Sequence, residues 1–483
     1  MADDAPGAGE PPFIADARAF ARRHRSHPAF VILGWFVGAS PEEADVLIQH
    51  LYCAGLPSNT IQIDESPART VAGLALLPLY YLATKKWWWR PAARTDCNVE
   101  TIDPAFFNRG FSRLYPLLRG SRRLTPREGG DFGGEEKTLP CLSSVLLQDL
   151  LRLAVVLPAW IPALALLSWR TGLNFLRTCR QAVAVYLCYS GYFRRFPCRR
   201  FVTFDDMPNH PCRQLAFKRH GGEEQVSIQN GERGLLPQCA FGMVDHYCVF
   251  GPAHVGMMRS IGTRAAVIEP VGALWLNAWR DEYLRETAEG MPPPRYDIIF
   301  IDQGAWPHNG VPKYFDDALL ELLDNLAEFG RRHPTVGLFY QLRPYGTSGT
   351  EHRAAVLRRL QTRYQGVFTV LENDGKGQSY GNILRAKLVV TFESSLGFES
   401  LMMGKKALFV NYSGNPGETA CPDSRFQIED ESADYPSFEA KVSGLLAAEL
   451  REVPQAARDR CGFFDGRTQE RVAESIARAR APL

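Results

Sequence analysis

Two serines, a glycine and a glutamate follow an apolar stretch in the second half of the chain. Residues 388–392 form a short run of leucine followed by β-branched and aromatic residues, as a buried parallel strand requires. Ser394, Ser395 and Gly397 come next, and Glu399 lies in the first turn of a predicted short helix over 398–403. A helix N-terminus at the carboxyl end of a strand offers N–H groups to an anion. We expect the serines to bind phosphate or ribose and the glycine to permit close approach of the backbone to the ligand. We expect Glu399 to accept hydrogen bonds from ribose hydroxyls. The alternative is that the serines only cap the helix.

A second group of polar residues follows three strand-like stretches nearer the N-terminus. The predicted strands cover residues 201–204, 225–228 and 247–251, and a helix over 211–219 separates the first two. Glycines after the second strand permit a sharp turn, so polar side chains there are expected to face a ligand. The alternative is that the acidic pair caps a helix and the histidine is an ordinary surface residue. The residues of this group are Asp205, Asp206, Gln229, Asn230, Glu232 and His246.

Strand and helix alternate most regularly over residues 296–411, which is the strongest fold signal in the chain. Residues 296–301 read as a strand that delivers Asp302, Gln303 and Gly304, and residues 336–342 as a strand that delivers Arg343. The Pro-rich stretch 289–295 breaks any regular element. We therefore predict a domain boundary there.

Composition excludes several classes of protein. The 483 residues allow two ordinary domains, and 45% hydrophobic with 22% charged residues is typical of globular proteins. A net charge of +2 does not favour nucleic-acid binding. Eleven cysteines without a C-x-x-C pattern fit reduced thiols in the cytosol. The first dozen residues lack the basic and apolar layout of a signal peptide.

The N-terminal region reads as a βαβ opening. Residues 13–27 look helical and basic, 30–36 read as a buried strand, 40–54 as a helix, and 59–64 as a second strand. Ser40 and Glu43 have the spacing of a capping box. The pattern predicts a Rossmann-like first domain, with an unrelated α/β module as the alternative.

Two apolar windows raise the question of a membrane. Residues 70–84 precede two lysines and three tryptophans, a composition that suits the membrane interface. Residues 151–169 have the length of a short span, but Arg152, Pro158 and Pro162 oppose one. For the first window a core helix is the favoured alternative. For the second we predict a helical insertion that packs on the domain or lies on the inner leaflet. Residues 120–138 are rich in glycine and charge, which predicts a loop.

The segment T-F-E-S-S-L-G-F-E-S-L-x-x-G-K-K-A-L-F, residues 391–409, resembles the donor-binding segment of GT-B glycosyltransferases that build bacterial surface polysaccharides. It is similar to the surface carbohydrate biosynthesis transferases and, more distantly, to Kdo and sialic-acid transferases and CDP-glycerol phosphotransferases. F-D-D … S-I-Q-N-G-E-R-G, from residue 204, resembles the acceptor-side loops of the same group, and F-D-G-R near residue 464 also resembles the family. The resemblance covers roughly residue 200 to the C-terminus.

The resemblance implies a chemistry. In the family, a cation at the strand end occupied here by Arg343 faces the donor phosphates, so Arg343, the helix N-terminus and the serine pair would neutralise the leaving nucleotide. No spaced D-x-D follows a strand, so we expect neither a metal nor another cofactor. The acceptor base, or a nucleophile in a retaining enzyme, is assigned to Asp206 or Glu232, with His246 third. Asp205, Gln229 and Asn230 would lie on the acceptor side, and Gln303 and Gly304 on the donor side.

The expected architecture is therefore α/β of the GT-B type, with two Rossmann-like domains facing across a cleft. We divide it into an extension 1–28, an acceptor domain 29–290 with a helical insertion around 140–195, and a nucleotide-sugar domain 291–483. The expected partners are a CMP-, UDP- or GDP-linked sugar and a glycan or lipid-linked acceptor of capsule or lipopolysaccharide synthesis, without nucleic acid. The expected location is the cytoplasm, including the cytoplasmic face of the inner membrane. The alternatives are a CDP-glycerol-type phosphotransferase, a UDP-sugar 2-epimerase and an inactive GT-B binding subunit.

Overall fold

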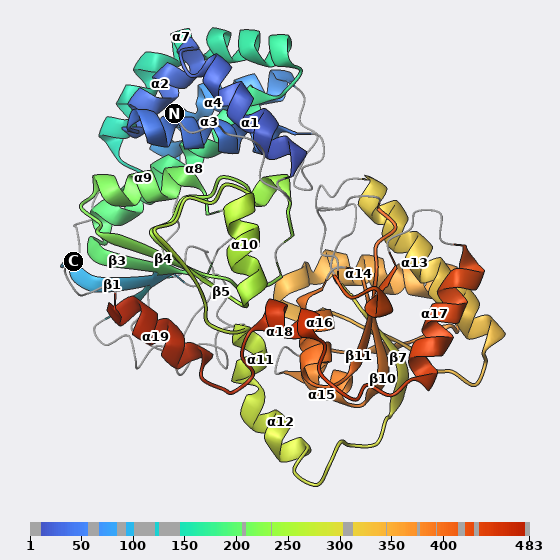
Figure 1. Ribbon diagram of the computed structural model, residues 1–483. Helices are drawn as coiled ribbons and strands as arrows, with labels where there is room; N and C mark the ends of the chain where they lie inside the picture. The colour runs from blue at the N-terminus through green and yellow to red at the C-terminus, as the bar shows by residue number, and fades with distance from the viewer. Residues whose placement is uncertain are drawn as a thin grey trace.

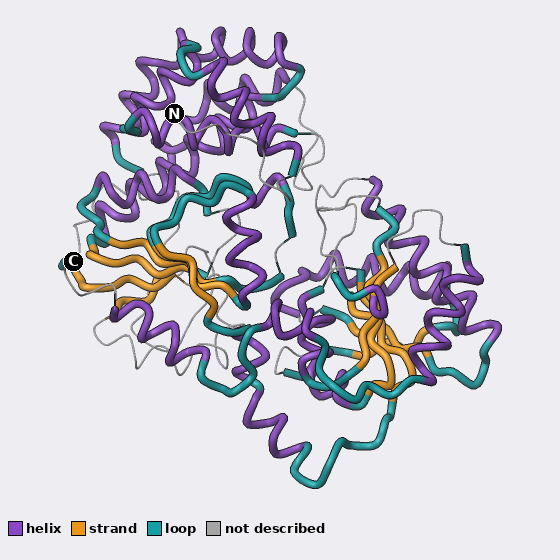
Figure 2. Tube along the Cα trace, viewed as in Figure 1, coloured by secondary structure: helices purple, strands orange, loops and turns teal. Residues whose placement is uncertain are grey.

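The computed structural model describes residues 11–56, 67–84, 93–100, 121–124, 145–204, 209–232, 234–302, 313–343, 345–373, 377–392, 394–413, 421–428 and 434–478. Within these residues the strands form two separate parallel sheets of six strands each, and helices cover both (Figures 1 and 2). This arrangement confirms the α/β class with two Rossmann-like units.

A layer of helices lies beside the first sheet, at the end of the molecule away from the second (Figure 1). Most of its buried apolar residues form one cluster with Phe201 of the first sheet and Phe217 of α9 (Pro211–Arg219). The helices of the layer are α1 (Pro12–His24), α2 (Pro28–Val37), α3 (Pro41–Gly55), α4 (Pro67–Thr84), α7 (Leu147–Thr171) and α8 (Phe175–Arg195). The last two supply the predicted helical insertion around residues 140–195.

The first predicted strand, residues 30–36, is wrong, because these residues belong to helix α2. Pro28 occupies its first turn, the His27 side chain accepts from the Ala29 N–H, and Gly38 ends the helix at φ 71°. A proline at the start and a left-handed glycine after the end are helix signals. The run is apolar on every side, and a period of two cannot be told from 3.6 in such a run.

The predicted βαβ opening is therefore absent from the described residues, whereas two predicted helices are confirmed. Residues 13–24 are helical, and α3 has the predicted capping box between Ser40 and Glu43. The expected strand 59–64 and the tryptophans at 87–89 lie outside the described residues. The predicted loop 120–138 is wrong at its start, because residues 121–124 form a strand paired with residues 97–100.

The first sheet has the order β2-β1-β3-β4-β5-β6 with every pairing parallel. Helices α9, α10 (Pro252–Ser260), α11 (Leu274–Ala278) and α12 (Arg280–Glu286) connect its later strands and lead to the second sheet. Its strands are β1 (Thr95–Glu100), β2 (Ser121–Leu124), β3 (Cys198–Thr203), β4 (Glu224–Ile228), β5 (His246–Val249) and β6 (Val267–Pro270).

The second sheet has the order β12-β11-β10-β7-β8-β9, again all parallel. The chain builds β7, β8 and β9 in one direction, then returns to the other side of β7 with β10. The strands are β7 (Tyr296–Ile301), β8 (Leu338–Gln341), β9 (Phe368–Leu371), β10 (Ala386–Thr391), β11 (Lys406–Val410) and β12 (Gln427–Ile428). The helices are α13 (Lys313–Arg332), α14 (Tyr345–Arg363), α15 (Gln378–Leu384), α16 (Ser395–Met402), α17 (Tyr435–Ala447) and α18 (Gln455–Cys461).

Helix α18 joins the two units, since it contacts α16 of the second and α10 of the first. The approach is so close that a side chain at Gly251 would collide with the Asp459 carbonyl oxygen. Beyond α18 the chain returns to the first sheet, where α19 (Thr468–Arg478) contacts α11. The end of the chain thus packs on the first unit, and one buried apolar cluster runs through residues of both sheets.

Candidate active site at the junction of the two sheets

The strand order of the second sheet reverses between β7 and β10. In open parallel sheets, ligands bind beyond the carboxyl ends of the strands at such a reversal. Asp302 follows β7, and Ser394 follows β10 directly before helix α16. The reversal therefore coincides with the serine pair predicted from the sequence, while Gln303 and Gly304 lie outside the described residues.

The start of α16 is built by local contacts. The Oγ of Ser394 accepts from the Leu396 N–H at 3.3 Å, and its own N–H donates to Thr391 Oγ1 at 3.1 Å. Ser394 is thus the cap that the alternative interpretation proposed, and Ser395 is the first helical residue. A side chain at Gly397 would collide with the Phe409 ring of β11. The glycine is explained by the packing of α16 on the sheet.

Arg343 lies at the same edge of the second sheet, directly after β8. Its backbone N–H points at Asp302 Oδ2, 3.5 Å away, and the Tyr340 hydroxyl donates to Asp302 Oδ1 at 3.2 Å. The buried Asp302 carboxylate thus ties the turn after β8 to the end of β7. A cation and a helix N-terminus at one sheet edge form the kind of site that neutralises phosphate.

Glu399 is buried within α16, with 1% of its surface exposed. Its Oε2 accepts from the Tyr380 hydroxyl of α15 at 2.5 Å. Burial, with a smaller effect of the nearby Glu232, raises the pKa of Glu399 to about 7, although hydrogen bonds from Tyr380 and Ser395 act in the opposite direction. At neutral pH this carboxyl therefore holds a proton in a large fraction of molecules. It is bonded inside the protein, and its expected ribose contact stays a prediction.

Glu232 follows β4 at the carboxyl edge of the first sheet, and its side chain is 3% exposed. His254 Nε2 of α10 lies 3.0 Å from its Oε1, and Arg460 Nη1 of α18 donates to the same oxygen at 2.5 Å. Burial raises the pKa of Glu232, but the charges and hydrogen bonds of His254 and Arg460 outweigh burial and hold it below the ordinary value. The group is therefore an ionised carboxylate at neutral pH.

Glu232 and Glu399 lie close enough for the charge of Glu232 to raise the pKa of Glu399, and Arg460 lies beside both segments. Besides binding Glu232, its guanidinium lies 5.3 Å from the ring centroid of Phe398, the neighbour of Glu399. The site thus combines an ionised carboxylate from the first unit with a carboxyl group of raised pKa from the second. Two such groups with divergent pKa values are a feature of acid–base sites.

His254 is the residue here that the sequence interpretation left out of its candidates. It is fully buried, and its Nδ1 has no hydrogen-bond partner among the described residues. A carboxylate that holds one ring nitrogen leaves the other free to accept or donate a proton. The sequence contained a signal for His254, because this residue follows β5 in G-P-A-H, at the carboxyl edge of the sheet. The sequence contained no comparable signal for Arg460 or Tyr380.

The two amides predicted on the acceptor side hold loops together. Gln229 donates to the Gly231 carbonyl at 2.8 Å and accepts from the Phe250 N–H at 2.7 Å. Asn230 donates to the Phe204 carbonyl at 2.7 Å. These bonds connect the ends of β3, β4 and β5, which places Glu232. Asp205 and Asp206 lie outside the described residues.

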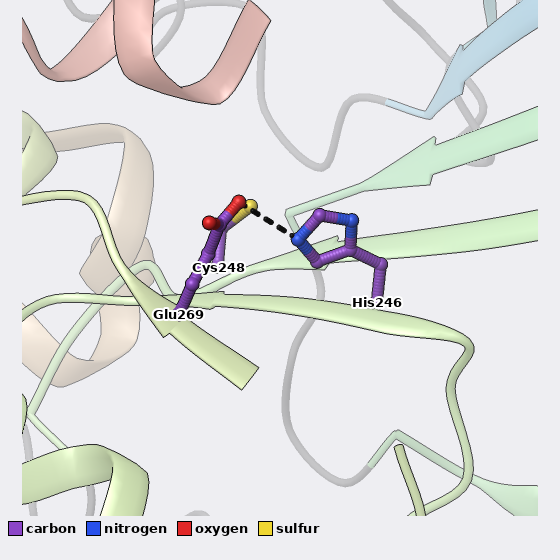
Figure 3. A group of neighbouring side chains, drawn as sticks. All are labelled: His246, Cys248 and Glu269. Atoms are coloured by element: carbon purple, nitrogen blue, oxygen red, sulfur yellow. Dashed lines mark hydrogen bonds and ion pairs between the residues drawn. The ribbon is translucent and has the colours of Figure 1, made fainter. Parts of the chain in front are cut away.

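His246 lies apart from this site. It is the first residue of β5, at the amino end of the strand, whereas Glu232 follows the carboxyl end of β4. Figure 3 shows its ring beside the Cys248 thiol and the Glu269 carboxylate, and the donor atoms of the three lie within 4.8 Å of one another. Its Nε2 is 3.0 Å from Glu269 Oε1. The structure therefore does not bring His246 to Glu232, the other predicted base among the described residues, or to His254, the partner of Glu232.

Helix α19 closes the His246 cluster. Ser475 Oγ lies 2.7 Å from the His246 Nε2, and Arg478 donates to Glu269 Oε2 at 2.8 Å. Burial lowers the pKa of His246, but hydrogen bonds with Cys248 and neighbouring carboxylates raise it to about 11. These contacts fasten α19 to the first sheet.

Comparison with known proteins identifies the fold. No protein-family model matches the chain, and no curated protein matches its sequence. The chain is similar to the UDP-GlcNAc 2-epimerase of Methanocaldococcus jannaschii, solved with UDP-GlcNAc and UDP, with a TM-score of 0.51 and 9% identity over 80% of this chain and 100% of that one. A putative UDP-N-acetylglucosamine 2-epimerase from Listeria monocytogenes has a TM-score of 0.49 and 10% identity, over 81% and 99%. The wall teichoic acid polymerase TagF has a TM-score of 0.42 and 10% identity, over 85% and 96%. The first likeness shows that the chain has a GT-B-type fold.

Proposed function

We propose that this protein is a GT-B glycosyltransferase that takes a sugar from a nucleotide-activated donor. The observation that carries the proposal is that Arg343 and the N-terminus of α16 lie at the same carboxyl edge of the second sheet, after the strands on either side of β7, where the strand order reverses. An arginine can hold a phosphate through two parallel hydrogen bonds, and a helix N-terminus adds positive potential. The fold likeness to an enzyme solved with UDP-GlcNAc and UDP supports the choice of a nucleotide-sugar donor.

In the proposed reaction, an acceptor hydroxyl oxygen attacks the anomeric carbon of the donor sugar. The bond from that carbon to the phosphate oxygen breaks, and the nucleotide leaves with the electron pair. Arg343 and the α16 amides stabilise the negative charge that develops on it. Protein groups supply this stabilisation, so we propose that no metal and no other cofactor is required.

The acceptor proton needs a base. Glu232 is bound by Arg460 and His254, which lower its pKa and make it a weak base. We propose that Glu232 orients His254, whose Nδ1 takes the proton, as a carboxylate orients histidine in many hydrolases. Asp206 stays a candidate on the sequence alone.

The biological role follows the resemblance of residues 391–409 to surface-polysaccharide transferases. We propose a CMP-, UDP- or GDP-linked donor and a glycan or lipid-linked acceptor, as in capsule or lipopolysaccharide synthesis. Each cysteine in the described part of the chain is a free thiol, which agrees with the proposed cytoplasmic location.

A UDP-sugar 2-epimerase is the second candidate, favoured by the fold likeness and by the paired carboxyl groups of divergent pKa. An epimerase needs no acceptor, because it inverts one carbon by removing and returning a proton. Incubation of the protein with its sugar nucleotide in deuterated water separates the two. Deuterium incorporated into the sugar without acceptor indicates an epimerase, whereas a transferase leaves the donor unlabelled.

The experiment that tests the proposal is a thermal-shift screen with CMP, UDP, GDP, their sugar conjugates and CDP-glycerol. A ligand present at a hundredfold excess over its dissociation constant stabilises the folded state by about 2.7 kcal/mol. One nucleotide class should stabilise the wild type and have much less effect on Arg343→Ala. Arg331→Ala, an exposed arginine on α13, is the matched control and should respond like the wild type. Stabilisation by CDP-glycerol alone indicates a phosphotransferase, and no response to any compound favours a binding subunit.

A further inference from the structure

Helix α7 is apolar on every side between Arg152 and Arg170, yet one side of it is exposed. Its 25 residues contain a window of mean hydropathy 2.1, of which 33% is buried. A helix that is hydrophobic all round normally belongs to a protein core or to a membrane. One side of α7 packs in the core of the helical layer, whereas its exposed apolar side has no apolar neighbour among the described residues.

The two sides of α7 have different neighbours. Leu150, Leu153, Leu157, Trp160 and Leu164 are buried, and the helix contacts α2, α4 and α8. The opposite side is an exposed stripe without a charged residue between Arg152 and Arg170. It consists of Leu151, Ala154, Val155, Pro158, Ala159, Pro162, Ala165, Leu166 and Trp169.

Neighbouring helices extend this stripe into a wider surface. Of the fourteen large hydrophobic side chains exposed among the described residues, ten lie on α2, α4 and α7, so the exposure is concentrated in one layer. Val155 and Trp169 are the most exposed, at 78% and 80%. The apolar face, as we define it, comprises Val31, Trp35, Leu76, Leu79, Tyr80, Leu147, Leu151, Val155, Leu166 and Trp169.

Cations and aromatic rings border the apolar face. The Arg152 guanidinium lies 4.6 Å from the ring centroid of Trp35. At the other end of α7, Trp169 precedes Arg170, whose charge lowers the pKa of His27 in addition to the effect of burial. Tryptophan beside arginine is the composition found at the depth of lipid headgroups, where the ring is half in hydrocarbon and the cation meets phosphate.

We propose that the apolar face lies in the plane of a membrane that contains anionic lipids, with α7 parallel to the surface. The orientation follows from the other side of α7, where buried Asp149 accepts from Ser190 at 2.8 Å and lies 3.6 Å from Arg219. A helix crossing the bilayer would have to lose its packing on α2, α4 and α8 and these contacts of Asp149 at its start. The inference is independent of the reaction proposed above, because it requires neither the donor nor the acceptor.

The test is flotation of the full-length protein with phosphatidylcholine vesicles that contain or lack phosphatidylglycerol. The wild type should float with anionic vesicles, less at high salt, and weakly with neutral ones. The triple variant Leu151→Ser, Val155→Ser and Trp169→Ser should lower the partition coefficient roughly a hundredfold, because three large apolar groups no longer enter the lipid. An unchanged far-ultraviolet circular dichroism spectrum confirms that this variant is folded.

The matched control is Leu284→Ser with Met291→Ser, two exposed apolar residues outside the apolar face. This variant should float like the wild type. The proposal is overturned if the wild type stays at the bottom of the gradient with anionic vesicles, or if the triple variant floats equally well. Retention after alkaline carbonate extraction would overturn the parallel orientation and show a span. A concentration-dependent dimer without vesicle binding, abolished in the triple variant, would assign the face to a second copy of the chain.

Discussion

Replacement of Glu399 by glutamine tests the buried acid of the proposed site. Burial raises the pKa of this carboxyl from 4.5 to about 7. One pH unit corresponds to about 1.4 kcal/mol, so ionising Glu399 costs the folded state about 3 kcal/mol at alkaline pH. Because the folded-state pKa lies above the unfolded one, stability is lost as pH rises from 4.5 to 7 and stays lost above it. Glutamine keeps an acceptor for the Tyr380 hydroxyl and never ionises.

The assay is urea denaturation of wild type and Glu399→Gln at about pH 5.5 and about pH 8.5. The unfolding free energy of the variant, relative to that of the wild type, should rise by about 2 kcal/mol between these two pH values. This rise is smaller than the full ionisation cost, because part of that cost is already present at the lower pH. Glu449→Gln changes an exposed glutamate and serves as control, with a pH dependence parallel to the wild type. If the unfolding free energy of Glu399→Gln has the same pH dependence as that of the wild type, Glu399 titrates as in water. The description of Glu399 and Tyr380 as a buried pair is then wrong.

Three further predictions concern the other charged groups. Arg343→Ala should weaken nucleotide binding in calorimetry by about 1.5–3 kcal/mol and Ser395→Ala by about 1, since a charge-assisted hydrogen bond is the stronger; an equal or reversed order would contradict the phosphate role. Arg460→Met should cost roughly 3 kcal/mol of unfolding free energy because it removes a partner of buried Glu232, and adding Glu232→Gln should restore part of the loss; additive effects in the double-mutant cycle would show that the two do not interact. His246 has a pKa raised to about 11, so its stabilisation is complete below pH 6.5 and declines towards pH 11. His246→Gln should therefore lose more stability at about pH 6 than at about pH 10, and an equal loss would refute a protonated imidazole.

The fold could be predicted from the sequence where a sequence pattern fits only one type of secondary structure. Apolar runs of four to six residues between helices predicted β3, β4, β7 and β10, because a buried parallel strand needs such a run. The capping box of α3 was equally clear. The strand prediction for residues 30–36 was wrong because an apolar run without a clear period fits either a strand or a buried helix. The flanking Pro28 and Gly38 were the signals that indicated a helix.

The site was predictable only where it is contiguous in sequence. Ser394, Ser395 and Glu399 lie within six residues, so a strand and a helix suffice to place them. The pair of Glu232 and Arg460 joins residues 228 positions apart, and no local pattern predicts such a contact. The prediction of His246 instead of His254 reflects the shortness of β5, whose four residues put the two histidines at opposite ends.

A structure of the protein with the nucleotide selected by the thermal-shift screen would show whether the second sheet binds a nucleotide at its strand reversal. We expect phosphate oxygens within hydrogen-bond distance of the Arg343 guanidinium and of the first N–H groups of α16. A nucleotide bound at the first sheet, with Arg343 and α16 free of it, would refute this assignment.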